Sequence, residues 1–507
     1  MPQVDLLEHE FLQMLSSVRS TKNSFVPINR IPPEVLSLVA HNCDEDEDLI
    51  ALTHVCHRWR EIFTSCPSLW TSLECEVVDK TRVYLERSKA SPLKISLEDL
   101  DTSGDAFYLL LPHLGRLGSL SLFRSLRSNL LELTKHLGSP APLLKNLKLV
   151  VANDEKLVLQ DNIFDGDLSS LRRLHLDGVI SNLAWENVSN LQTFILRDIP
   201  GDKVSVNKLL HLFERAPLLR KIDIDDALPD SSDAPPGRVE PLPNLELLRV
   251  ETCAEKSHTI LLNHLSIPTG ALITQDFDFS DANSPILFHL PKTFENLKNL
   301  SNIASINLGF DTGVDLRLNG PSGGLVMCGS WDGNGPSPTL AGCQGLRSLS
   351  AFRISEVERL TISYWSHTLP RKGTNRALVY QTLLLMGNLR ALSLTSCVNL
   401  SFIIALNPKE NTSRALICPK LEELTVYGNK RGWFCGEEIL EMAKERSFRG
   451  AKLKTVTFID PQELIPAREV FELRAYVSHV EHKFDGYPPR WDSIPGVPDN
   501  TGYESDE

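Results

Sequence analysis

A six-residue pattern, Leu-x-x-Leu-x-Leu, recurs along most of this chain and constrains its fold more than any other feature. The copies are LGSLSL at 117–122, LKNLKL at 144–149, LRRLHL at 171–176, LQTFIL at 191–196, LRKIDI at 219–224, LELLRV at 245–250, IASINL at 303–308, VERLTI at 357–362, LRALSL at 389–394, LEELTV at 421–426 and LKTVTF at 453–458. Most neighbouring copies start roughly 20 to 32 residues apart. Two longer gaps are each expected to hide a degenerate copy, and TQDFDF at 274–279 fits one of them.

A repeat of this length and pattern predicts a leucine-rich solenoid. Each copy is expected to supply one short parallel strand with its apolar side chains pointing inward, followed by a helix or an irregular segment such as VSVNKLLHLFERA at 204–216. The sequence therefore predicts an α/β chain whose solenoid runs from 76 to 460. Loops are expected near 225–244, which is rich in Pro and Asp, and near 309–345, where glycines are expected to form turns between short strands. A helical cap at 461–485 and a disordered acidic tail at 486–507 are expected to follow.

The strand face opposite the core is a candidate protein-binding surface. Side chains alternate along a strand, so residues between the inward positions point away from the core and form a continuous ribbon across stacked copies. The candidate binding residues on this ribbon are Arg173, His175, Lys221, Asp223, Leu247, Arg249 and Tyr427. Arg249 with Leu247, and Tyr427, are favoured because binding hot spots combine Arg or Tyr with a partly apolar surround. The alternative is a solvated strand face that has no partner.

The region before the repeats has a different pattern. In LIALTHVCHRWREIF, from Leu49 to Phe63, apolar residues recur at spacings of three and four, which predicts one amphipathic helix with Asp48 as its N-cap. Cys56, His57 and Cys66 raise the alternative of a metal site. Adjacent residues point about 100° apart on a helix, so Cys56 and His57 converge poorly on one ion, and we expect no metal here.

A shorter helix is expected upstream, in INRIPPEVLSLVAHNC, where Pro32 and Pro33 suit a first helical turn. Residues 1–26 are expected to form a further helical segment. Three short helices in about 45 residues are too small a unit to bury all of their apolar surface, and leftover apolar surface on a small module indicates a partner site.

These residues together resemble an F-box. The resemblance rests on Ile31-Pro32-Pro33-Glu34-Val35, then Leu49-x-x-Leu52-x-x-Val55-Cys56-x-x-Trp59-Arg60, then Pro67-x-Leu69-Trp70, and it covers residues 27–75. It is strongest to the F-box proteins of mushroom-type fungi, and the later repeats resemble the irregular leucine-rich repeats that follow many F-boxes. The chain departs from the pattern in having Ile31 where Leu is usual and in its acidic loop from Cys43 to Asp48.

The resemblance implies a substrate-recognition subunit of an SCF-type cullin–RING ubiquitin ligase. The F-box would dock on the Skp adaptor and through it on a cullin, the solenoid would bind a protein substrate through the ribbon above, and the chain would need no catalytic residue and no cofactor. The expected adaptor-binding residues are Ile31, Pro32, Val35, Leu36, Val39, Leu49, Leu52, Val55, Cys56 and Trp59. The alternatives are a helical cap on the next domain, a leucine-rich scaffold with no ubiquitin role and, more distantly, a hydrolase or transferase.

Composition excludes several other classes. A net charge of -13 argues against a general nucleic-acid binder and against a polybasic membrane-surface protein. No apolar run approaches the roughly 20 residues that span a bilayer, and the N-terminus is acidic where a signal peptide is basic. The ten Cys form no Cys-x-x-Cys pair, and no nucleophile elbow or His-Glu metal spacing is present. We therefore expect a cytoplasmic or nuclear protein that binds neither nucleic acid nor membranes.

Overall fold

The computed structural model describes residues 2–43, 46–74, 77–98, 106, 108–125, 135–151, 157–160, 162–183, 187–229, 231–251, 256–279, 290–291, 293–310, 313–331, 345–364, 376–395, 399–410, 416–427, 436–459 and 467–483. The chain divides into two compact units. Unit 1 comprises residues 1–204 with 215–217, and unit 2 comprises 205–214 with 218–507. The acidic tail expected at 486–507 lies outside the described residues, as does the start of the helical cap expected at 461–485.

Unit 1 begins with short helices. They are α1 (Pro2–Ser24), the 3-10 helix η1 (Pro27–Arg30), α2 (Pro33–His41), α3 (Asp46–His54), α4 (His57–Ser65), the 3-10 helix η2 (Pro67–Trp70) and α5 (Val78–Arg87). Pro33 occupies the first turn of α2, where its missing N–H breaks no helical hydrogen bond. A helical segment therefore occupies most of residues 1–26, and α2 lies where the Pro-Pro pair predicts it.

The single helix predicted from Leu49 to Phe63 is wrong, because the structure divides it into α3 and α4. The chain is extended at Cys56 (φ -161°, ψ 169°), which is the N-cap of α4. Arg60 reaches back across the break, and its Nε donates to the carbonyl oxygen of Thr53 at 3.1 Å. This bond satisfies a carbonyl in the last turn of α3, so ending the helix there leaves that oxygen paired. The apolar spacing of three and four continues across the break and conceals it. The helix also starts at Asp46 rather than after an Asp48 cap.

The rest of unit 1 is a ladder of parallel strands in chain order. The strands are β1 (Ser72–Leu73), β2 (Leu93–Glu98), β3 (Leu117–Ser125), β4 (Asn146–Val151), β6 (Arg173–Asp177) and β8 (Thr193–Arg197). A small parallel pair, β5 (Leu157–Val158) with β7 (Val179–Ile180), accompanies them, as do the 3-10 helices η3 (Leu111–Arg116) and η4 (Ile163–Gly166). The leucines of each predicted copy are buried: in LRRLHL, Leu171, Leu174 and Leu176 have no exposed surface.

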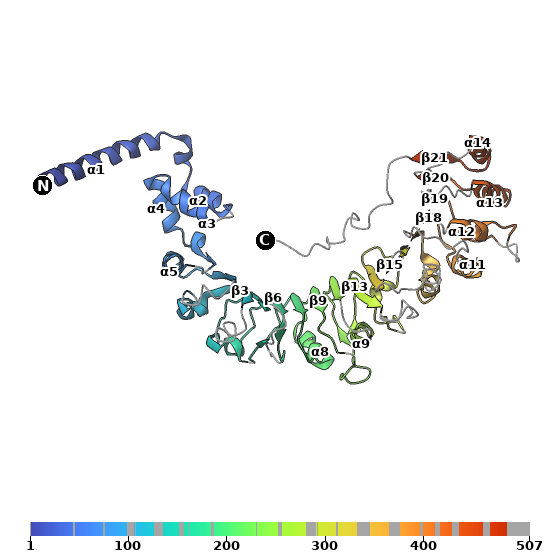
Figure 1. The fold of residues 1–507 in the computed structure, drawn as a ribbon, viewed down its shortest axis with the longest axis horizontal. Helices are drawn as coiled ribbons and strands as arrows, with labels where there is room; N and C mark the ends of the chain where they lie inside the picture. Colours follow the sequence, from blue (N-terminus) through green and yellow to red (C-terminus); the bar gives the residue numbers. More distant parts are fainter. Residues whose placement is uncertain are drawn as a thin grey trace. The chain divides into compact units, whose positions relative to one another are not determined.

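Unit 2 contains a longer ladder with helices along one side (Figure 1). Its strands pair in the order β9 (Lys221–Asp225), β11 (Leu247–Glu251), β13 (Leu272–Phe279), β16 (Gly324–Trp331), β15 (Gly313–Asn319), β14 (Ser305–Phe310), β17 (Arg359–Tyr364), β18 (Ala391–Thr395), β19 (Glu423–Tyr427), β20 (Thr455–Ile459) and β21 (His479–Lys483). Neighbours are parallel except at β15, which is antiparallel to both β14 and β16. A short pair joins β10 (Glu240–Pro241) to β12 (Leu265–Ser266).

The helices of unit 2 follow individual strands and bury the inward side chains. They are α8 (Val206–Arg215), α9 (Ser257–Asn263), α11 (Arg376–Leu385), α12 (Asn399–Leu406), α13 (Gly436–Phe448) and α14 (Ala467–Tyr476), with the 3-10 helices η6 (Lys298–Leu300) and η7 (Ile354–Glu356). Figure 1 shows α11 to α14 stacked beside β18 to β21. Helix α8 lies in the predicted segment 204–216, and the C-terminal segment holds the strand β21 as well as the helix α14.

The Gly-rich segment near 309–345, where turns between short strands are expected, contains the strands β15 and β16. Its glycines allow backbones to approach closely. A Cβ on Gly324 would lie 2.2 Å from the carbonyl oxygen of Leu318, and one on Gly313 would lie 2.0 Å from that of Gly329. Only glycine fits at such positions, so these residues serve strand pairing in addition to turns. The described residues of the Pro- and Asp-rich segment 225–244 are mostly irregular apart from β10.

The chain is thus an α/β structure in which N-terminal helices precede large, mostly parallel strand ladders with helices. Among the described residues, no helix is both long and apolar enough to cross a membrane.

Candidate docking surfaces

Three aromatic side chains form the interior of the N-terminal helices. Trp59 and Trp70 are buried, and each indole N–H has a partner: Nε1 of Trp59 donates to Oδ1 of Asn29 at 2.6 Å, and Nε1 of Trp70 donates to the carbonyl oxygen of Phe63 at 2.8 Å. Phe63 packs edge-to-face against Trp59, with ring centroids 5.5 Å apart. These contacts fix η1, α4 and η2 relative to one another. The two Trp are therefore core residues.

The same helices leave apolar side chains in solvent. Val35, Leu38, Val39, Ile50 and Val55 are 39% to 62% exposed, and we call these five residues the apolar surface. Val35, Leu38 and Val39 share one face of α2 by their spacing, while Ile50 lies in α3 and Val55 follows it. Large apolar side chains exposed this densely on a small helical region indicate a protein-binding surface.

The residues expected to bind an adaptor fall into three groups. Pro32, Val35, Val39 and Val55 are exposed; Ile31, Leu52 and Cys56 are half-buried; Leu36, Leu49 and Trp59 are buried. Only the exposed and half-buried residues can contact a partner directly. The buried residues support them from inside, as in Leu36 beneath the exposed face of α2.

Two exposed apolar residues are not among the expected adaptor-binding residues. Leu38 lies three positions after Val35, and Ile50 lies next to the buried Leu49. The spacing to Val35 is a signal that could have placed Leu38 on the same face. No comparable signal marks Ile50, because the packing of α3 on α4 decides which of its apolar side chains points inward.

The cysteines and histidines of this region show ordinary polar contacts. Cys66 Sγ lies 3.4 Å from Oγ of Ser68, and His57 Nδ1 lies 3.5 Å from Oε2 of Glu61. Across the part of the chain that the structure describes, no group of three or more His, Cys, Asp or Glu side chains is arranged to hold a metal ion.

Comparison with known families agrees with this geometry. Residues 28–76 match the model of the F-box-like family. This match confirms the F-box resemblance and supports a role as an F-box adaptor protein. F-box domains typically act as non-catalytic adaptors, and they bind the Skp adaptor within SCF complexes. The apolar surface lies inside the matched F-box region. No curated protein matches the chain.

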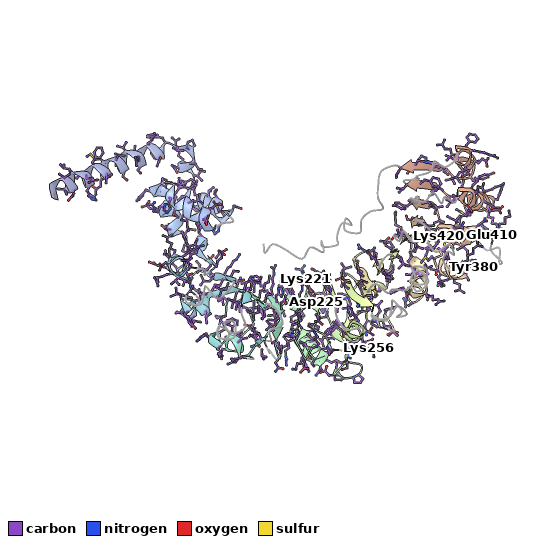
Figure 2. The ribbon with its side chains drawn as sticks, viewed as in Figure 1. Lys221, Asp225, Lys256, Tyr380, Glu410 and Lys420 are labelled. Carbon is purple, nitrogen blue, oxygen red and sulfur yellow. The ribbon has the colours of Figure 1, made fainter. Side chains whose placement is uncertain are left out.

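The second candidate surface is the face of the unit 2 ladder away from the helices, which we call the open face. On the first two strands its side chains pair in register: Lys221 with Leu247, Asp223 with Arg249, and Asp225 with Glu251. Lys221 and Asp225 lie at this face of β9, on the opposite side from α8 (Figure 2). On later strands Asp276 pairs with Cys328 and Cys328 with Asp315, so carboxylates recur at the same level of the ladder.

Burial and neighbouring arginine side chains have opposite effects on the pKa of these carboxyl groups. Arg249 and Arg317 form ion pairs with Glu251 and Asp315 respectively, the second with Nε 3.0 Å from Oδ1. Burial nevertheless raises the pKa of both carboxyl groups above its ordinary value, because it outweighs the arginine neighbours. Burial, assisted by Asp315, also raises the pKa of the Cys328 thiol to about 12, which keeps it protonated and unreactive.

The predicted ribbon residues all lie on strands, but one of them is buried. Lys221, Leu247, Arg249 and Tyr427 are half-buried on the open face of unit 2, but Asp223 is buried. In unit 1, Arg173 is exposed and His175 is half-buried on β6. Sequence alternation predicts which side of the strand Asp223 occupies; it does not reveal that neighbouring side chains cover it.

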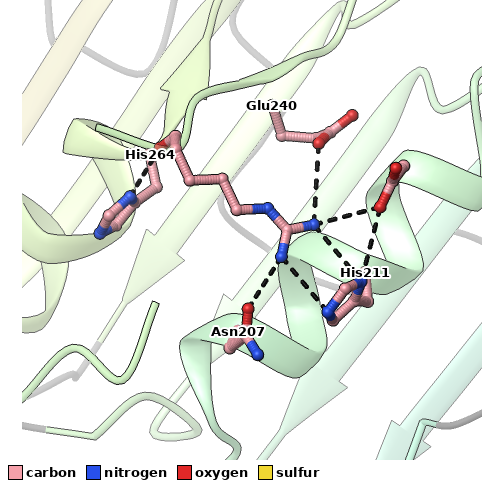
Figure 3. Close-up of polar contacts among 6 residues, drawn as sticks. Asn207, His211, Glu240 and His264 are labelled. Carbon is pink, nitrogen blue, oxygen red and sulfur yellow. Dashed lines mark hydrogen bonds and ion pairs between the residues drawn. The ribbon is translucent and has the colours of Figure 1, made fainter. Parts of the chain in front are cut away.

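A polar cluster surrounds Arg238, which lies in the segment between β9 and β10 (Figure 3). Arg238 donates to Oδ1 of Asn207 at 2.8 Å and to Oε2 of Glu214 at 3.2 Å, both on α8. Its carbonyl oxygen accepts from Nδ1 of His264 at 2.8 Å. From the same segment, Asp233 accepts from the backbone N–H of Asn207 at 3.0 Å, in the first turn of α8. The cluster therefore fastens this segment to α8 and is a structural feature.

Proposed function

We propose that the chain is the substrate-receptor subunit of an SCF-type cullin–RING ubiquitin ligase. The F-box region docks on the Skp adaptor, and through it on a cullin, while the strand ladders bind a protein substrate. The observation that carries this proposal is the apolar surface, which lies within residues matching the F-box-like family. In this role the chain acts by proximity: it raises the effective concentration of substrate lysines near a ubiquitin-conjugating enzyme.

We further infer that the ladders form an irregular leucine-rich-repeat solenoid. A strand occupies every predicted copy, and buried apolar positions alternate with half-buried or exposed ones in strands such as β6, β8 and β11. Each repeat buries its leucines against its neighbours, which is how solenoid repeats gain stability. The closer resemblance to F-box proteins of mushroom-type fungi stays a prediction.

Adaptor binding provides the direct test. The variant Val35→Ala, Leu38→Ala, Val39→Ala and Val55→Ala removes much of the apolar surface without touching the buried Trp59 or Leu36. Truncating a buried interface side chain removes on the order of 1–3 kcal/mol, so we expect at least a ~100-fold weaker affinity for the purified Skp adaptor, measured by calorimetry. Leu384→Ala with Leu385→Ala is the matched control, because these leucines are similarly exposed but lie on α11 of unit 2.

The same titration separates the alternative function. A leucine-rich scaffold with no ubiquitin role would show no binding of the wild-type chain to the adaptor. Wild-type binding that the four substitutions leave unchanged, with a native circular dichroism spectrum, would instead reject the apolar surface as the docking site.

The substrate is proposed to bind the open face. Arg249 beside Leu247, and Tyr427 on β19, combine the side chains that dominate protein interfaces with a partly apolar surround. Photoreactive residues at positions 249 and 427 should capture a common protein in cells, and one at Phe448, exposed on α13, should not. Capture from Phe448 alone would place the substrate on the helical side.

A further inference from the structure

Helix α1 carries an apolar stripe that stays in solvent. Val4, Leu7, Phe11, Met14 and Val18 recur at alternating spacings of three and four residues, and each is 62% to 69% exposed. We call these five residues the α1 stripe. This spacing repeats every seven residues, which is the pattern that lets two helices pack along a shared seam.

A covering partner explains why such a helix is stable. Most helical stability in proteins comes from packing of an amphipathic face rather than from intrinsic helix propensity. The side-chain hydrogen bonds within α1 are local, such as the contact of 2.9 Å between Gln13 Nε2 and His9 Nε2. The helix therefore gains stability if another surface covers the stripe.

The charges of α1 specify which surface fits. Its first half is acidic, with Asp5, Glu8 and Glu10, and its second half is basic, with Arg19 and Lys22. At 3.6 residues per turn, Arg19 lies about 20° and Lys22 about 40° around the helix from Glu8. All three therefore border the same edge of the α1 stripe, at opposite ends of the helix.

A second α1 running in the opposite direction matches both the apolar spacing and the charge distribution of the helix. If Phe11 packs opposite Met14 of the second copy, the same register places Leu7 opposite Val18, and the two-fold axis repeats each contact. Glu8 then lies beside Arg19 and Lys22 of the second copy, along the matching edge. A parallel, in-register pair would instead bring the two acidic halves together and the two basic halves together, so Glu8 would have no basic residue of the second copy at its own level.

We propose that α1 joins two copies of this chain through an antiparallel helix pair. The occupant of the α1 stripe is the α1 of a second copy, and charge complementarity sets the direction. The α1 stripe and the apolar surface share no residue, so this pairing uses none of the apolar side chains of α2 and α3. If the chain is a substrate receptor, a dimer presents two open faces to one substrate and strengthens binding by avidity.

The first experiment measures mass by sedimentation of the full chain from about 1 to 50 μM, a range that separates weak from stable self-association. We expect a dimer for the wild type and a monomer for Phe11→Glu with Met14→Glu. Leu12→Glu is the matched control, because Leu12 is 58% exposed on α1 but lies off the stripe, and it should remain dimeric. A monomeric wild type across this range overturns the proposal, as does a Leu12→Glu chain that dissociates equally.

Charge reversal tests the direction. Glu8→Lys alone, and Arg19→Glu with Lys22→Glu, should each weaken the dimer about tenfold at low salt. Combining all three substitutions restores opposite charges across an antiparallel pair and should recover the affinity. A triple variant as weak as the partial variants overturns the antiparallel arrangement. Adaptor affinity, measured in parallel, should not change in any of these chains, so failure here is distinguishable from failure of the proposed ligase role.

Discussion

The F-box region and the strand ladders differ in how completely they bury their apolar side chains. In the ladders, leucines of successive copies are buried against one another and against helices, and the outward positions are largely polar. In the F-box region, α2 buries Leu36 and leaves Leu38 in solvent two positions later. The inward apolar side chains of the ladders are therefore buried, although helices of unit 2 expose single residues such as Leu384 and Phe448, whereas the F-box region exposes several apolar side chains within a short stretch. This difference separates residues that stabilise the fold from residues available for binding.

Substitution of two leucines of α2 gives the largest predicted difference in the free energy of unfolding. Leu36 is 1% exposed and Leu38 is 62% exposed, so one helix offers both a buried and an exposed leucine for comparison. We expect Leu36→Ala to lower the free energy of unfolding of the F-box region by about 2–5 kcal/mol, because it leaves a cavity. Leu38→Ala should change it by less than about 0.5 kcal/mol. Hydrogen exchange of amides in α2 and α4 measures both.

The same two substitutions should have the opposite order of effect on affinity for the Skp adaptor. Under conditions where both variants are folded, Leu38→Ala should weaken binding more than Leu36→Ala does. Equal loss of stability in the two variants would show that Leu38 is covered in solution and would break the comparison.

Replacing a glycine of the unit 2 ladder by alanine gives the next largest predicted loss of stability. A Cβ at Gly324 meets the carbonyl oxygen of Leu318, a backbone atom that cannot rotate away, so Gly324→Ala should destabilise unit 2. Overpacking of this kind costs about 1–3 kcal/mol. Gly387→Ala is the control, because nothing lies within 4 Å of its added Cβ. Urea unfolding followed by circular dichroism should show a lower midpoint for the first variant alone, while adaptor binding stays unchanged in both.

The smallest predicted effect is a pH dependence confined to unit 2. Burial raises the pKa of Asp315 despite Arg317, so the folded state holds this proton more tightly than the unfolded chain does. The free energy of unfolding should therefore rise as pH falls through the raised pKa, and level off below the unfolded value. Asp315→Asn should flatten this rise, whereas Asp79→Asn, exposed on α5 of unit 1, should leave it intact. An identical pH profile for Asp315→Asn and the wild type would contradict the assignment.

Much of the ladder could be predicted from sequence because its determinants are local. Copies such as LRRLHL and LEELTV combine three inward apolar positions with alternation, and each coincides with a strand. The strand β2 (Leu93–Glu98) and the terminal β21 were missed, because neither lies in one of the Leu-x-x-Leu-x-Leu copies that guided the prediction.

Features set by long-range packing could not be predicted in the same way. The break at Cys56 depends on Arg60 bonding to Thr53, and the apolar spacing is unchanged across it. The pairing of β15 with β16 brings backbone carbonyl oxygens close to Gly313 and Gly324, and glycine-rich sequence alone does not reveal this contact because it also indicates turns. Which expected adaptor residues face solvent likewise depends on how short helices pack, so the expected set is mixed in exposure and its role in binding stays a prediction.

The order of strands around β15 has a consequence for how unit 2 assembles. Most strands pair with the next strand along the chain, so a growing ladder can extend one repeat at a time. The strand β13 instead pairs with β16, which the chain reaches only after β14 and β15. During synthesis, β13 must therefore wait with an open edge until residues 324–331 emerge, and an open edge is a template for wrong pairing. We expect the block from β13 to β17 to fold as one cooperative step, and as the slowest one in unit 2.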